Sequence, residues 1–68
     1  MNKDYAILTY NGVIVDVVTY LACAIGMLRR WSEANPNVDF NYREATPLES
    51  NQAHLIQTQS MRNYNFPD

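Results

Sequence analysis

The stretch DYAILTYNGVIVDVVTY, residues 4–20, constrains the fold of this chain more than any other feature. Its central Asn11-Gly12 stands between two runs of apolar and β-branched residues. This dipeptide is the strongest short-range signal of a β-hairpin. The pattern predicts strands over Asp4–Tyr10 and Val13–Thr19, joined by a two-residue type I′ turn.

Both faces of the expected hairpin are apolar, although a sheet with one solvated face alternates apolar and polar residues. The turn places Leu8 opposite Val15 and Ile7 opposite Asp16. The first face is wholly apolar and is expected in the core; it consists of Ala6, Leu8, Tyr10, Val13, Val15 and Val17. The second face consists of Tyr5, Ile7, Thr9, Ile14, Asp16 and Val18. Either the C-terminal helix of this chain or another chain must cover the second face.

A helix is predicted over Tyr20–Ala34, with Thr19 as its N-cap and its end before Pro36. Apolar residues at helical spacing form the expected buried stripe, namely Leu21, Ala24, Ile25, Leu28 and Trp31. The opposite face carries no charge in its first half, whereas a surface helix is normally polar there. On that face Ala22 and Gly26 are small residues four apart, which allows another backbone to come close.

The remaining chain predicts a strand over Val38–Ala45 and a helix that starts at Thr46. Thr46-Pro47-Leu48-Glu49 has the N-cap, the proline and the acid of a capping box. This helix is expected to run to Thr58, and residues 59–68 are expected to be a flexible tail.

The elements predict one small α+β domain over residues 1–58. We expect a three-stranded antiparallel sheet of ββαβ topology, with the third predicted strand beside the first and spatial order 2-1-3. The main helix lies on one face, which makes two layers, and a short C-terminal helix follows.

Composition argues against several classes of function. The net charge is −2 and the five Lys and Arg residues form no stripe, so direct nucleic-acid binding is not expected. With Cys23 and His54 as the only cysteine and histidine, we expect no disulfide, metal or cofactor. Nothing in their spacing supports a nucleophile and base, so we expect no enzyme.

Location and membrane association follow from the same sequence. No apolar segment typical of a signal peptide precedes the hairpin. The mostly apolar stretch from Val13 to Leu28 contains Asp16 and passes from strand to helix, so it is not a membrane span. The chain is therefore expected to be cytoplasmic.

Binding to a protein partner is the class of function that these arguments leave. Asp16 on the second hairpin face is either a solvated aspartate or a charged anchor within a binding patch. Contiguous exposed apolar surface usually marks a binding site. The candidate partner-binding residues are Tyr5, Ile7, Ile14, Asp16, Val18, Ala22, Cys23, Gly26 and Met27.

Across VVTYLACAIGMLRRW and VDFNYREATP, the order of hairpin, helix and strand resembles that of small phage-encoded inhibitors of host proteins, such as host RNA polymerase. The resemblance lies in size and element order, and no residue role follows from it. It implies a non-enzymatic module that binds and occludes a larger host protein of the defence or nucleic-acid-processing machinery. The alternative is a structural or regulatory homo-oligomer that pairs through the helix outer face or a sheet edge.

Overall fold

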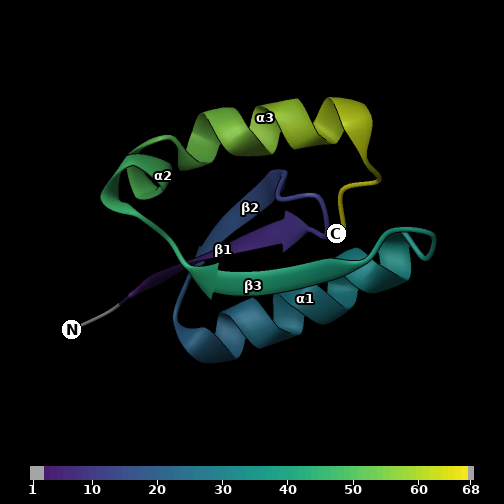
Figure 1. Cartoon of the computed structure of the whole chain (residues 1–68), viewed down its shortest axis with the longest axis horizontal. Helices are drawn as coiled ribbons and strands as arrows, with labels where there is room; N and C mark the ends of the chain where they lie inside the picture. The colour runs from purple at the N-terminus through teal and green to yellow at the C-terminus, as the bar shows by residue number, and fades with distance from the viewer. Residues whose placement is uncertain (1–2, 68) are drawn as a thin grey trace.

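The computed structural model describes residues 3–67, which form a three-stranded sheet with one helix over a face and another along the edge strand β2 (Figure 1). The strands are β1 (Asp4–Thr9), β2 (Ile14–Thr19) and β3 (Phe40–Glu44); the helices are α1 (Leu21–Ala34), α2 (Pro47–Asn51) and α3 (Ala53–Asn63). The strands pair antiparallel in the order β2-β1-β3. The predicted α+β class, strand order, main helix and short C-terminal helix are confirmed.

The hairpin turns at Asn11-Gly12, but the turn is not the predicted type. Type I′ requires a positive φ at both residues, and of the two only Gly12 has one, at 87°. The Gly12 N–H donates to the Thr9 carbonyl at 2.9 Å, and the Thr9 N–H donates to the Val13 carbonyl at 2.9 Å. These bonds define a three-residue loop, Tyr10–Gly12, in which Gly12 takes the left-handed position of a G1 bulge.

The longer turn changes the register near the tip of the hairpin. Leu8 pairs with Ile14 instead of Val15, whereas Ile7 pairs with Asp16 as predicted. Val15 is therefore the extra residue of a β-bulge, which restores the predicted register further along the ladder.

The same turn removes two residues from the predicted core. Tyr10 lies in the loop and Val13 directly follows it, and they are 87% and 49% exposed. Their prediction as core residues is wrong because it assumed the two-residue turn.

The two hairpin faces are both covered by this chain. Ile7 and Asp16 pair across the ladder and so share a face. That face is covered by α1, because the Trp31 indole Nε1–H donates to Asp16 Oδ2 at 3.2 Å. The paired Ala6 and Val17 point to the other face. Thus α1 covers the second hairpin face, and α3 packs along the edge strand β2 (Figure 1).

The buried stripe of α1 is rotated from the predicted one. Ala24 and Trp31 are fully buried, and Met27 and Leu28 pack against the core. Met27, one of the predicted partner-binding residues, is half-buried and lines a surface cleft beside Cys23 and Gly26 as well as packing against the core. Leu21 and Ile25, predicted to be buried, are 44% and 48% exposed. The side of α1 that carries Trp31 faces the sheet, because the Trp31 indole bonds Asp16. Leu21 and Ile25 lie on another side of the helix and therefore face solvent.

The N-cap of α1 is Tyr20 rather than the predicted Thr19, and its side chain makes no capping hydrogen bond. The backbone φ of Tyr20 is 71°, a conformation that bulky residues rarely adopt. Such strain costs about 1–3 kcal/mol and clusters at functional sites.

The C-terminal elements extend beyond their predicted bounds. The capping box at Thr46 and Glu49 is confirmed, but the helix it starts, α2, ends at Asn51. Helix α3 follows and continues to Asn63, past the predicted end at Thr58. Residues 64–67 then return to pack against Trp31 (Figure 1). The prediction of a loose tail from residue 59 is wrong because these aromatic contacts hold the segment.

Candidate functional site

The second hairpin face is not an open binding surface. Ile7 and Asp16 are 0% and 1% exposed. Tyr5, Ile14 and Val18 on the same strands are half-buried. Since α1 lies over this face, and since Ile14 pairs with Leu8 beyond the bulge and so points to the opposite face, the five predicted partner-binding residues of the hairpin do not form one patch that a partner can reach.

Asp16 is a buried hydrogen-bond acceptor that joins both helical layers. Its carboxylate accepts from the Trp31 indole of α1 at 3.2 Å and from the Gln57 amide of α3 at 3.0 Å. It also accepts from the Val17 backbone N–H at 2.8 Å. Asp16 is therefore neither a solvated aspartate nor an anchor for a partner, and both interpretations of it are wrong. Its neighbour Val15 is the bulged residue.

The outer edge of β2 is occupied by side chains of this chain. The Val17 N–H, which points away from β1, donates to Asp16 as described above. The carbonyl of the bulged Val15 accepts the Ser60 hydroxyl of α3 at 2.6 Å. A further strand would have to break these bonds, so this edge is poorly suited to strand addition.

The outer edge of β3 is occupied in a similar way. The Tyr42 N–H donates to the side-chain oxygen of Asn41 at 2.8 Å. The Glu44 carbonyl accepts from the Arg43 guanidinium at 3.0 Å. A strand added at either edge, the pairing mode expected as an alternative, would have to displace these side chains.

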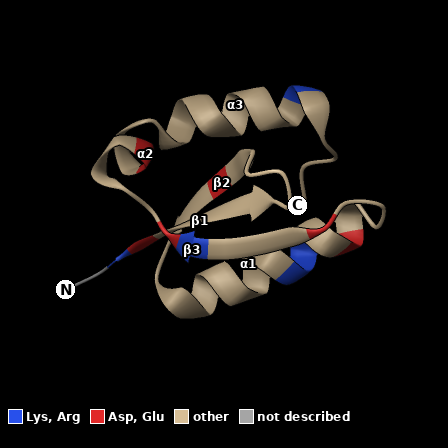
Figure 2. Cartoon of the chain, in the orientation of Figure 1, with Lys and Arg blue, Asp and Glu red and all other residues tan. Residues whose placement is uncertain are grey.

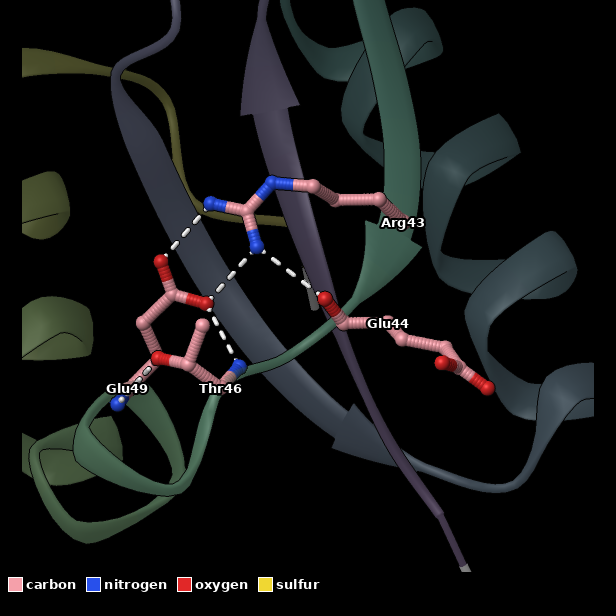
Figure 3. Close-up of polar contacts among 4 residues, drawn as sticks. All are labelled: Arg43, Glu44, Thr46 and Glu49. Atoms are coloured by element: carbon pink, nitrogen blue, oxygen red, sulfur yellow. Dashed lines mark hydrogen bonds and ion pairs between the residues drawn. The ribbon is translucent and has the colours of Figure 1, made fainter.

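Arg43 also holds α2 onto β3 (Figure 3). Its guanidinium grips the Glu49 carboxylate with two bonds of 2.8 and 2.7 Å. The same carboxylate accepts the Thr46 backbone N–H at 2.9 Å. The Arg43 bonds first, and then the Thr46 bond, lower the pKa of Glu49 to about 2. Glu49 is a structural cap, as its sequence context predicts, and not a site of chemistry.

The outer surface of the N-terminal half of α1 is the one candidate region that stays exposed. We define the α1 docking face as Leu21, Ala22, Cys23, Ile25 and Gly26, all of which are exposed. Three of these were predicted as partner-binding residues; Leu21 and Ile25 were missed because periodicity placed them in the core. Leu21 and Ile25 are four positions apart, a spacing that occurs both on the buried face of a helix and on an exposed apolar face.

The α1 docking face is uncharged and contains a shallow cleft. Figure 2 shows that Lys, Arg, Asp and Glu on α1 are confined to its C-terminal half. A cleft of about 300 Å³ lies along the helix and is lined by Cys23, Gly26, Met27 and Arg30. Apolar surface therefore borders basic surface one turn further along the helix.

Gly26 has no role within the chain that requires a glycine. A Cβ added there would meet no atom within 4 Å, and its φ is not positive. Glycine inside a helix costs about 1 kcal/mol relative to alanine. Its absence of a side chain does, however, let a second backbone approach the helix closely.

Within residues 3–67, the cysteine and the histidine lie on different helices. Cys23 is an exposed free thiol on α1, and His54 lies on α3 across the sheet (Figure 1). Within residues 3–67, no three His, Cys, Asp or Glu side chains are grouped so that they could hold a metal ion. None of the helices in this range combines the length and apolar character that a membrane crossing requires.

Comparison of the chain with protein-family models, with curated proteins and with solved structures found no match. The function is therefore argued from the surface of the molecule, and above all from the α1 docking face.

Proposed function

We propose that this chain is a non-enzymatic protein-binding module and that the α1 docking face is where it binds its partner. The observation that carries the proposal is an uncharged, exposed apolar surface on a helix whose other side is already fully packed. Exposed apolar surface of this kind typically marks protein interaction sites. Cys23, Gly26 and the half-buried Met27 provide a cleft for partner side chains.

The strained start of α1 agrees with this role. Tyr20 precedes the α1 docking face, is 54% exposed and adopts a φ of 71°. Strain of this kind persists where the surrounding structure imposes it, often at binding sites.

The partner that we propose is a larger protein, which the module would occlude in the manner of small phage-encoded inhibitors. A second copy of the chain is the other candidate. Ala22 and Gly26 favour it, because small residues one helical turn apart let two copies of α1 cross closely around a two-fold axis. In either case the chain works by covering a protein surface and not by chemistry.

The test uses Ile25→Glu, with Leu55→Glu as a matched control. Ile25 and Leu55 are 48% and 53% exposed and lie on different helices, α1 and α3. Both variants should fold, since neither side chain is in the core. Light scattering across a dilution series first measures whether the wild-type chain is a monomer or a dimer. Affinity capture from host lysate then identifies proteins retained by each variant.

The proposal expects Ile25→Glu alone to abolish either the dimer or the capture of a defined protein. A loss of dimer mass identifies a second copy as the partner, and a loss of capture from a monomeric chain identifies a larger protein. If wild type and Ile25→Glu have the same mass and retain the same proteins, the α1 docking face is not the binding site.

A further inference from the structure

The segment after α3 lies across the aromatic end of the core in an extended form. Tyr64 and Phe66 approach the Trp31 ring edge-on, with centroid distances of 6.5 and 5.2 Å. Phe40 of β3 completes the cluster at 5.6 Å from Trp31 and 6.4 Å from Tyr64. The two aromatic side chains of the segment are two positions apart, and both are half-buried.

Between these aromatic residues, Asn35 binds the main chain of the segment. Its Nδ2 donates to the Asn65 carbonyl at 2.8 Å, and its Oδ1 accepts the Asn65 N–H at 2.9 Å. Asn35 is 8% exposed, and Nδ2 also donates to the Trp31 carbonyl at 3.3 Å, which fixes the orientation of the amide. Asn35 contacts only backbone atoms of residue 65, and the Asn65 side chain adds one bond of its own, from its Nδ2 to the Ala34 carbonyl at 3.2 Å.

This arrangement has the parts of a peptide-recognition site. Extended peptides are held by main-chain hydrogen bonds, and pockets for alternate side chains supply specificity. Here Asn35 supplies the main-chain hydrogen bonds, and Trp31 with Phe40 supplies the pocket for the aromatic side chains. A cleft of about 270 Å³ opens beside Tyr64, between the hairpin loop and residues 37–39.

We propose that Trp31, Asn35 and Phe40 form a docking groove for an extended segment of a partner protein with two aromatic residues two positions apart. In the structure, Tyr64–Phe66 of the same chain occupies this groove. The C-terminal segment thus acts as an intramolecular competitor, and its release exposes the groove. This second surface is independent of the α1 docking face.

The cis occupant is of a kind that can leave. It follows α3, has no regular secondary structure, and is held by two half-buried rings and the Asn35 and Asn65 amides. Segments with few buried contacts open with free energies below that of global unfolding. A tethered competitor acts at an effective concentration in the millimolar range, so a partner binds weakly until the segment is displaced.

The test uses Trp31 as a reporter, since it is the only tryptophan and is fully buried. In the full-length chain, Phe66→Ala removes the ring that approaches Trp31 most closely and should shift its fluorescence to longer wavelength. An acetylated synthetic peptide of sequence RNYNFPD should then restore the wild-type emission. The wild-type chain should need at least about tenfold more peptide, because its own segment competes. The same peptide with alanine in place of its phenylalanine is the control.

The proposal is overturned if the folded Phe66→Ala chain does not respond to the peptide, or responds equally to the control peptide. If Phe66→Ala does not fold, as judged by its thermal melt, the wild-type chain is titrated with millimolar peptide. The NMR signals of the Trp31 indole N–H and the Asn35 side-chain amide should then shift. Unchanged signals would refute the groove.

Discussion

The two helices that cover the sheet are attached by different kinds of contact. Helix α1 inserts Trp31, which lies with Ile7 and Val15 in the fully buried core. Helix α3 has one fully buried side chain, Ser60, and joins the sheet through hydrogen bonds from Ser60 and Gln57. One layer thus depends mainly on the burial of apolar surface, and the other depends to a larger extent on directional polar bonds.

The difference shows why the chain needs Asp16 and the β-bulge. The bulge leaves the Val15 carbonyl without a strand partner, and Ser60 supplies the missing donor. Asp16 accepts one bond from each helix, so it connects the apolar layer to the polar layer. Buried polar groups contribute to stability only when they are paired, and this network leaves none of the described buried side-chain polar atoms unpaired.

The largest expected effect is on the apolar layer. Trp31→Ala should lower the free energy of unfolding by about 3–5 kcal/mol through lost burial and a cavity. A domain of this size is stable by only about 3–10 kcal/mol, so the variant should be partly or fully unfolded at 25 °C. Ile25→Ala on the exposed side of the same helix is the control and should cost less than about 1 kcal/mol. Urea denaturation followed by far-UV circular dichroism measures both, and a loss below about 2 kcal/mol for Trp31→Ala would contradict an α1 layer held by its core.

The next largest expected effect on the free energy of unfolding comes from Asp16, which connects α1 and α3. Asp16→Ala leaves the Trp31 indole and the Gln57 amide without their acceptor, which should cost about 2–3 kcal/mol. Asp16→Asn keeps one acceptor oxygen and should cost about half as much. The indole N–H of Trp31 should also exchange with solvent faster in Asp16→Ala, as measured by NMR. Equal stability of Asp16→Ala and wild type would mean that the carboxylate does not link the layers.

The unequal success of sequence-based prediction follows from this same difference. The hairpin, α1 and the β2-β1-β3 order follow from periodicity and turn signals, since apolar burial leaves a repeating pattern. The polar contacts of α3 leave no repeating pattern in the sequence, so the extension of α3 to Asn63 was not predicted. Asp16 was predicted at the surface because a charged residue is rarely buried unless paired. Its donors, Trp31 and Gln57, are distant in the sequence.

The candidate site was predicted in part for a related reason. Ala22, Cys23 and Gly26 were identified because the first half of the outer helix face lacks charge. Leu21 and Ile25 were assigned to the core, because periodicity alone does not fix which side of a mostly apolar helix faces the sheet. The hairpin half of the predicted site failed because sequence did not show which helix covers which face.

A smaller effect is expected where α3 meets the bulge. Ser60→Ala removes the donor to the Val15 carbonyl, which should cost about 1–2 kcal/mol. Thr58→Ala, on the exposed side of α3, is the control for helix propensity and should be nearly neutral. Hydrogen exchange should show faster opening of α3 in Ser60→Ala while α1 stays protected. Uniform loss of protection in both helices would show that the two layers open as one unit.

The smallest expected effect is a pH dependence confined to the polar side of the molecule. The pKa of Glu49 is lowered from 4.5 to about 2 by Arg43 and Thr46, so the folded state binds this proton less readily than the unfolded state. Its contribution is therefore fully present above about pH 4.5 and is lost as the pH falls toward 2. Solvent screens this partly exposed pair, so the contribution is on the order of 1 kcal/mol. Glu49→Gln should be less stable than wild type at pH 7, and the difference should shrink below pH 4.5. Hydrogen exchange at pH 3.5 and 6 should place the change in α2, because Glu49 caps that helix and Arg43 joins it to β3. A pH dependence that persists in Glu49→Gln would assign the loss to other carboxylates.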